Sequence, residues 1–472
     1  MDEFMRDSDA FSWHMERDPI LRSTVVAVAW LERSPDWDVL VAKLEGATRR
    51  VPMFRQRVLE SPAGLATPRW TMDGSFDLTW HLRRVDSPAP HTPDTVVALA
   101  RIAAMTAFDR SRPLWEFTLV ERLEDDRAAL IMKVHHALTD GLGGMRLGLL
   151  LFDMEPIVTP PVPEGGGPEP EHLGTGELLR QSLVRDWERF AGAMRQGAEL
   201  AAPSMVRMAR HPLASAGKLV DTTRSVARTV APVRATLSPI MTERGLDRRL
   251  EFLEVSLGDL RRAASVAGGT VNDAFLAAAT GGLRRYHEQH GTVVEKLRVT
   301  LPISIRTPED PPGGNRIALI RFAVPVSDPD PASRIRAMTR LCQAARGERS
   351  LPLTNAIAGA LNLLPHEVVA RIFKHVDFLA SDVPGFDFPV YLAGARVDRF
   401  VAFGPTIGSS VNMTLLSYNG TCFIGVTIDT AAAPDFTVLT CCLREGFEEV
   451  LALTGDHDPV CMSRQVRLSP ER

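Results

Sequence analysis

The sequence is poor in cysteine and has no long apolar run. It contains 5 cysteines in 472 residues, an odd number without the spacing of a disulfide framework, and a reducing compartment fits this usage best. No stretch of about 18 consecutive apolar residues is present, so we expect no transmembrane helix. The opening residues, MDEFMRDSDAF, lack the basic region and apolar core of a secretory signal. These absences favour a cytoplasmic location.

An excess of positive charge is also missing. The formal net charge is -4, so nothing in the overall balance points to nucleic acid as a partner. Hydrophobic residues make up 45% of the chain and charged residues 24%, which is typical of globular proteins. The length allows two or three domains, each with a full core. We find no internal repeat at the periods of solenoid proteins.

One heptapeptide combines two adjacent histidines with an aspartate and a glycine: His135, His136, Ala137, Leu138, Thr139, Asp140 and Gly141. It follows the apolar run 128–134, which predicts a buried strand, so the histidines should lie where that strand ends. Neighbouring side chains on extended backbone point to opposite sides, so only one ring can face a cleft. A neutral imidazole there can act as a general base. Asp140 is suited to cap a helix or to pair with a cation, and Gly141 permits unusual backbone angles.

Two other interpretations of the heptapeptide are available. The histidines could be ordinary turn residues, with Asp140-Gly141 as a turn signal only. A zinc site is the second alternative, but no Cys-x-x-Cys or His-Glu-x-x-His spacing supports it, so we expect no metal. The complete pattern at a strand end favours a general base over both.

The chain divides by composition into four parts. Residues 1–155 alternate predicted strands and helices and end with the heptapeptide region. Residues 156–245 begin with a Pro/Gly-rich linker and continue as a basic helical connector, with 13 Lys or Arg against 6 Asp or Glu between 180 and 249. Residues 246–456 form a second α/β segment, and 457–472 form a polar tail that we expect to be flexible. The connector either lies on an anionic membrane or packs between the two segments.

The heptapeptide resembles the His-His-x-x-x-Asp-Gly signature of the acyltransferases that share the chloramphenicol acetyltransferase and condensation-domain fold. Further blocks narrow the resemblance to the bacterial wax ester synthase/diacylglycerol acyltransferases and cover nearly the whole chain. These blocks are Pro113-Leu-Trp115-Glu116, Asn272-Asp273, Pro302-Ile-Ser304-Ile-Arg306, Gly314-Asn315-Arg316 and Ser381-Asp382-Val383-Pro384-Gly385. Asp382 stands where the family usually has Asn, and Phe386 stands where it usually has Pro. Substrate contacts at that turn are therefore less secure.

The resemblance implies two lobes with mixed sheets and a substrate tunnel between them. It also implies transfer of a long-chain acyl group from acyl-CoA to a diacylglycerol or a long-chain alcohol. Acyl-CoA would be a co-substrate, with no permanently bound cofactor. A peripheral contact with a membrane or lipid-inclusion surface would suit such acceptors. Chain length, acceptor preference and oligomeric state are not predicted.

Within this framework His136 is the expected base and His135 the support of the turn. Asp140 would hold the loop through Arg306 or Arg316, between which the sequence does not choose. Trp115 is either a core aromatic or a substrate-facing residue. Asn272 and Asp273 are expected to fasten a helix start to the neighbouring lobe, with a direct catalytic part as the less favoured alternative.

Two alternative functions are retained. The same fold could use a carrier-protein thioester or another hydroxylated acceptor. The second alternative is a non-catalytic lipid-binding relative, although a binder has no need of the intact His-His and Asp-Gly.

Overall fold

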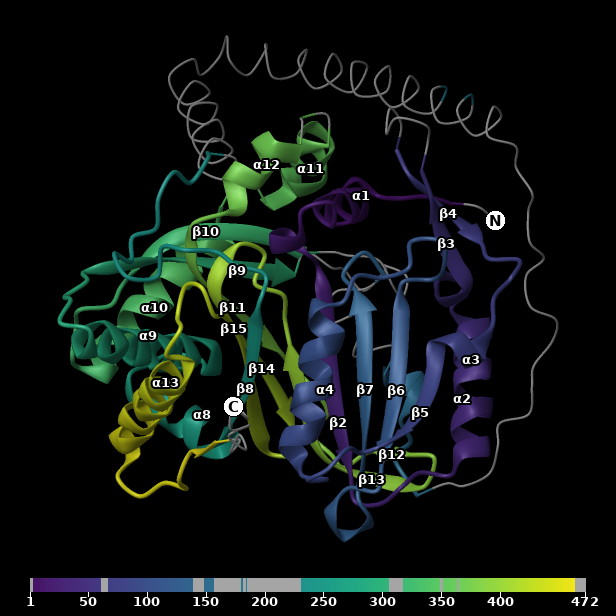
Figure 1. Ribbon diagram of the computed structural model, residues 1–472. Helices are drawn as coiled ribbons and strands as arrows, with labels where there is room; N and C mark the ends of the chain where they lie inside the picture. The colour runs from purple at the N-terminus through teal and green to yellow at the C-terminus, as the bar shows by residue number, and fades with distance from the viewer. Residues whose placement is uncertain are drawn as a thin grey trace, which may run out of the picture.

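The computed structural model describes residues 3–60, 67–138, 148–156, 180, 184, 231–304, 317–348, 351–362, 364 and 366–462. Within these ranges it has two large mixed sheets that lie side by side, with helices on their outer faces (Figure 1). Each sheet contributes to its own hydrophobic core. The mixed α/β architecture predicted from the sequence is confirmed.

The first sheet contains six described strands in the spatial order β12-β13-β2-β7-β6-β5. In chain order these are β2 (Thr24–Leu31), β5 (Leu82–Asp86), β6 (Trp115–Glu121), β7 (Ala128–His135), β12 (Tyr391–Leu392) and β13 (Ala395–Phe403). Strands β6 and β7 form an antiparallel hairpin, and the buried strand predicted from the apolar run 128–134 lies within β7. Helix α4 (Pro93–Met105) contacts β2 and β7, and α2 (Trp37–Arg50) adds apolar side chains to the same core.

Two strands of this sheet come from far along the chain. β13 pairs antiparallel with β2, and Phe400 lies opposite Ala29. The predicted division at residue 246 stays a prediction, and the pairing of β13 crosses it. The chain therefore returns to the first sheet after building most of the second, which joins the two halves through backbone hydrogen bonds.

The second sheet contains seven described strands in the order β10-β9-β11-β14-β15-β8-β16. They are β8 (Arg248–Ser256), β9 (Lys296–Ser304), β10 (Ile317–Pro325), β11 (Val376–Val383), β14 (Ser409–Tyr418), β15 (Thr421–Asp429) and β16 (Cys461–Met462). β14 and β15 form a hairpin that turns at Asn419-Gly420, where both residues have positive φ.

Four helices gather on one side of the second sheet (Figure 1). They are α8 (Leu257–Val266), α9 (Val271–Gln289), α10 (Pro331–Arg346) and α13 (Phe436–Leu451). α9 and α13 pack closely where Gly282 faces Gly446, because a Cβ on Gly446 would lie 2.4 Å from the Ala278 carbonyl oxygen. Glycine at this crossing allows the two backbones to approach.

Shorter elements complete the described fold. Helices α1 (Asp7–Met15), α11 (Thr354–Leu361) and α12 (His366–Phe373) lie together beyond one end of the two sheets (Figure 1). A third sheet joins β1 (Glu3–Phe4), β3 (Gln56–Leu59) and β4 (Arg69–Met72). β4 ends at Met72, and α3 (Leu78–His81) begins after Asp77, whose side chain caps it by accepting the Thr79 N–H. No helix among the described residues has the length and apolar character needed to cross a bilayer.

Candidate active site

The two histidines lie where β7 ends. His135 is the last residue of the strand and pairs with Thr24 of β2. The His136 backbone N–H donates to the carbonyl of Ser23, the residue before β2, at 2.9 Å, so the pairing extends one residue beyond β7. The Leu138 N–H then donates to the His135 carbonyl at 3.0 Å and begins a turn. The backbone is thus fixed on both sides of His136.

His135 packs behind the strand end and is fully buried. Its Nδ1 accepts the Ala137 backbone N–H at 3.0 Å, so the proton of a neutral ring belongs on Nε2. Nε2 lies 3.3 Å from Oε2 of Glu16, and the edges of Trp13 and Phe108 enclose the ring. These contacts fix the tautomer and orientation of His135 and support the turn.

Glu16 is a site residue that the sequence analysis missed. It follows α1, its side chain is 6% exposed, and its Oε2 accepts the Ser23 N–H at 2.9 Å. Burial raises the pKa of Glu16, but the His135 ring, the Ser23 N–H and the Arg22 charge outweigh burial and hold this pKa below its usual value. A single Glu after a helix carries no motif, so no pattern could have indicated it.

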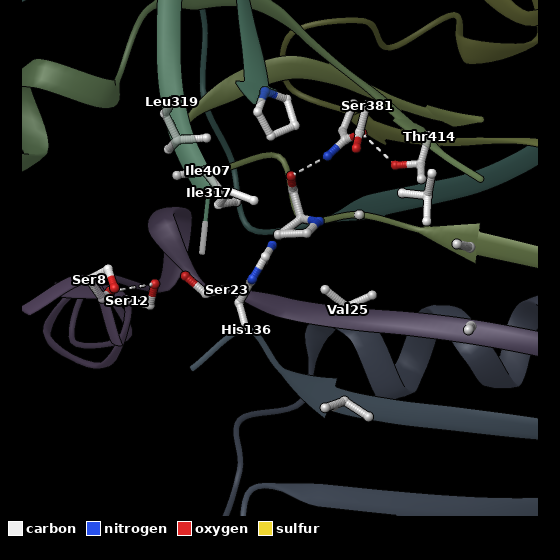
Figure 2. Close-up of a pocket in the computed structure, with 18 of the residues that line it drawn as sticks. Ser8, Ser12, Ser23, Val25, His136, Ile317, Leu319, Ser381, Ile407 and Thr414 are labelled. Atoms are coloured by element: carbon white, nitrogen blue, oxygen red, sulfur yellow. Dashed lines mark hydrogen bonds between the residues drawn. The ribbon is translucent and has the colours of Figure 1, made fainter. Parts of the chain in front are cut away.

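His136 points the other way and lines a cavity of about 320 Å³ between the two halves (Figure 2). The walls are mainly apolar, and a volume near the lower end of the range for ligand pockets suits a small or extended ligand. They come from α1, β2, α2 and β7 on one side and from β10, α11, β11 and β14 on the other. His136 is therefore a polar side chain in the wall of a mainly apolar cavity.

Polar groups of the second sheet lie across the cavity from His136, in the direction of Ser381 and Thr414 (Figure 2). Asn412 is 2% exposed; its Nδ2 donates to the Pro405 carbonyl at 2.6 Å, and its Oδ1 accepts the Thr414 hydroxyl at 3.0 Å. Gly404 lies against this pair, because a Cβ there would come 2.6 Å from Asn412 Nδ2. An Asn and a Thr two positions apart in an apolar strand was the available signal, and the sequence analysis did not use it.

Trp115 lies outside the cavity wall. It is fully buried, its ring stacks on His81 at 4.6 Å, and its Nε1 donates to the Phe54 carbonyl at 2.8 Å. Phe54 itself lines the cavity. Of the two interpretations, the described contacts are those of a core aromatic, one residue removed from the cavity.

Asn272 and Asp273 also lie away from the cavity wall. Asp273 completes a capping box with Thr270 at the start of α9, and its Oδ2 accepts the Thr339 hydroxyl at 3.0 Å. Asn272 Nδ2 lies 3.6 Å from the sulfur of Cys342. Thr339 and Cys342 belong to α10, so these contacts fasten two helices of the same half. The expected tie to the other lobe is not among the described contacts.

Four predicted site residues lie outside the described residues: Asp140, Gly141, Arg306 and Arg316. Their predicted roles, and the choice of arginine partner for Asp140, remain predictions. The described residues contain no group of three or more His, Cys, Asp or Glu side chains arranged to hold a metal ion.

The sequence matches two models of one family. Residues 5–275 match the wax ester synthase/diacylglycerol acyltransferase catalytic domain, and residues 313–451 match the C-terminal domain of that family. A putative diacylglycerol O-acyltransferase of Mycobacterium tuberculosis (strain ATCC 25618 / H37Rv) is 35% identical over 451 residues, which cover 94% of this chain and 91% of the relative. A second protein of the same description and strain is 30% identical over 438 residues, 88% of this chain and 89% of that relative.

Solved structures show the same fold. The wax ester synthase/diacylglycerol acyltransferase from Marinobacter aquaeolei VT8 superposes with a TM-score of 0.64 at 21% identity, covering 96% of this chain and 99% of that one. The starter condensation domain of rhizomide synthetase, in a mutant complex with C8-CoA, gives 0.57 at 13% identity, covering 97% and 96%. The predicted fold class is confirmed.

Proposed function

This chain belongs to the wax ester synthase/diacylglycerol acyltransferase family and is an O-acyltransferase, and we propose that His136 is its general base and acyl-CoA its donor. The supporting observation is the position of His136, held by backbone hydrogen bonds at a strand end and facing an apolar cavity built by both halves. His135 on the opposite side is the support residue.

The reaction needs no nucleophile from the protein. His136 accepts the proton of the acceptor hydroxyl, and the oxygen attacks the thioester carbonyl carbon. The tetrahedral intermediate collapses with cleavage of the carbon–sulfur bond, CoA leaves as the thiolate, and the protonated His136 returns the proton to the sulfur. The products are an ester and free CoA. Holding both substrates in one cavity converts their encounter into an intramolecular step.

Asn412 is proposed as a positioning residue on the opposite wall. Its amide group donates a hydrogen bond to the Pro405 carbonyl and accepts one from the Thr414 hydroxyl. Pro405 and Thr414 both line the cavity. Asn412→Ala would release the 404–406 segment, and we expect a loss of about 10-fold or more in kcat/KM. Because the base is retained, the loss should appear more in KM than in kcat, which separates this role from that of His136.

A lipid acceptor is proposed to arrive from a membrane or lipid-inclusion surface. Helix α11 supports this, because Ile357, Ala358 and Leu361 line the cavity. Beside it, Leu364 is 45% exposed and Val368 is 40% exposed. Apolar side chains exposed next to the wall of an apolar cavity are suited to contact with lipid.

The test is the release of free CoA thiol from palmitoyl-CoA, with a diacylglycerol and a long-chain alcohol offered in parallel. We expect release that depends on an acceptor, and the two rates will rank the acceptors. Palmitoyl thioester on an acyl carrier protein is the comparison donor. Acceptor-independent release, or equal release by wild type and His136→Ala, would refute the proposal.

A further inference from the structure

A second cavity of about 230 Å³ lies next to the first. Gly404 and Pro405 line both, so the 404–405 segment separates the two cavities. Whereas the His136 cavity is mainly apolar, the second one has two arginines and several hydroxyls in its wall. Its polar side chains are Arg22, Thr24, Arg248, Thr406 and Thr427.

Two of these polar residues are cross-strand partners of the candidate active site. Thr24 of β2 pairs with His135, and Thr427 of β15 pairs with Asn412. The second cavity therefore borders the active site from both sheets. Any group bound in it lies beside the wall that also faces His136.

The hydroxyls of this cavity are buried without partners. Thr24 and Thr427 are each 4% exposed, and neither Oγ1 has a hydrogen-bond partner in the described part of the chain. The same holds for Nε of Arg22. Buried polar atoms are normally paired, because an unpaired one loses its bonds to water and gains nothing. Three unpaired atoms around one cavity indicate a ligand with matching donors and acceptors.

The charge of the cavity favours an anion. Arg248 is 8% exposed and contacts Asp429 at 3.1 Å. Arg22 donates to the Met105 carbonyl and has no ion pair with a carboxylate among the described residues. Its charge acts on the buried Glu16 carboxylate, but among the described residues the two do not form an ion pair like that of Arg248 with Asp429. Burial chiefly, with the nearby Arg22 charge in addition, lowers the pKa of Arg248. A negative charge in the cavity would therefore stabilise the charged form of both arginines.

We propose that this second cavity binds the phosphopantetheine arm of the thioester donor, an inference that rests on the proposed function. The arm has amide groups, which match the hydroxyls of Thr24 and Thr427, and a phosphate, which matches the positive charge of Arg22. Its other end is the thioester, which has to reach His136 in the adjoining cavity. CoA and carrier proteins present the same arm, so the cavity serves either source.

The experiment measures binding without turnover. Titration calorimetry follows CoA, pantetheine without phosphate, and inorganic phosphate on the wild type, Arg22→Gln, the double variant Thr24→Val/Thr427→Val, and Thr440→Val. Thr440 is a matched control, since its buried hydroxyl donates to the Phe436 carbonyl within α13 at 2.8 Å. We expect both cavity variants to bind CoA about 10-fold more weakly than wild type, and Thr440→Val to bind it normally.

The individual ligands separate the two parts of the arm. Arg22→Gln should weaken the binding of CoA and leave the binding of pantetheine unchanged, whereas the double threonine variant should weaken the binding of both ligands. The double variant should also unfold at the same or a higher temperature than wild type, because the hydroxyls it removes have no partners. Unchanged CoA affinity in both cavity variants overturns the proposal.

The source of the ligand is tested separately. CoA and palmitoyl-loaded acyl carrier protein should both lose affinity in Arg22→Gln, since they share the arm. If Arg22→Gln instead weakens only binding to phosphatidic acid vesicles, the cavity holds a lipid headgroup and the proposal is wrong. Wild type that binds CoA through these residues without transferring acyl groups refutes the proposed function alone. Turnover that requires His136 but ignores both cavity variants refutes this inference alone.

Discussion

The two sides of the strand end at residues 135–136 differ in almost every physical respect. On one side His135 is fully buried among Trp13, Phe108 and Glu16, with its Nδ1 taken by a backbone N–H. On the other side His136 faces a cavity. Two identical side chains in adjacent positions therefore lie in different environments, one packed in a core and the other facing a cavity. The difference teaches that strand alternation, more than residue type, assigns their roles.

His136→Ala gives the largest expected effect. Loss of a general base should lower kcat by about 10² to 10⁴, since that is the usual contribution of such a group. The midpoint of urea unfolding should change little, because the ring lines a cavity and not a packed core. An activity loss that accompanies a large loss of stability would erase the contrast between the two sides.

His135→Ala should act mainly on stability. Removing a buried ring and the acceptor of the Ala137 N–H should cost about 3 kcal/mol of unfolding free energy, as measured by urea denaturation. Activity should fall as a consequence of the loosened turn. If the variant keeps its stability but loses as much kcat as His136→Ala, then His135 takes part in the chemistry.

Glu16→Gln sharpens the comparison through pH. The folded-state pKa of Glu16 is depressed, so its ionised form contributes stability above the unfolded-state pKa, and this is lost as pH falls through the folded-state value. At pH 7 we expect a loss of about 1 kcal/mol in the variant. Urea unfolding across an acidic pH series should show the difference from wild type shrinking toward low pH. A difference that stays constant across the series would show that Glu16 is not the titrating partner.

Asp273→Ala should have the smallest effect of the four variants, and it provides a comparison from the second half of the molecule. Loss of the capping box should cost about 1 kcal/mol of stability, typical of a helix cap. kcat per folded protein should be unchanged, because Asp273 contacts α10 and not the cavity. A fall in kcat without a fall in stability would return the Asn272-Asp273 block to the active site.

Much of the local structure follows from the sequence alone. β2 coincides with the apolar, β-branched run Thr24–Leu31, and α2 begins at Trp37, directly after Asp36. Both are set by patterns within a few residues: a β-branched apolar run, and apolar residues at helical spacing after Asp36. The strand before the histidines was predicted from neighbouring residues, and the family was predicted from ordered motifs.

The sequence did not predict which residues pack against these elements. Glu16 lies beneath His135 over a distance of more than 100 residues in the chain, and Asn412 belongs to a strand of the other half. The pattern of a strand states which side chains share a face but not what they face.

The sequence by itself determined the order of strands and helices, the histidine turn at a strand end and the acyltransferase family. Only the tertiary structure decided which residues line the cavity that His136 faces, that β13 returns to the first sheet, and that Arg22, Thr24 and Thr427 line one pocket. The physical reason is that periodicity and capping act through neighbours along the chain. A site between two sheets instead arises from contacts whose partners are chosen by packing.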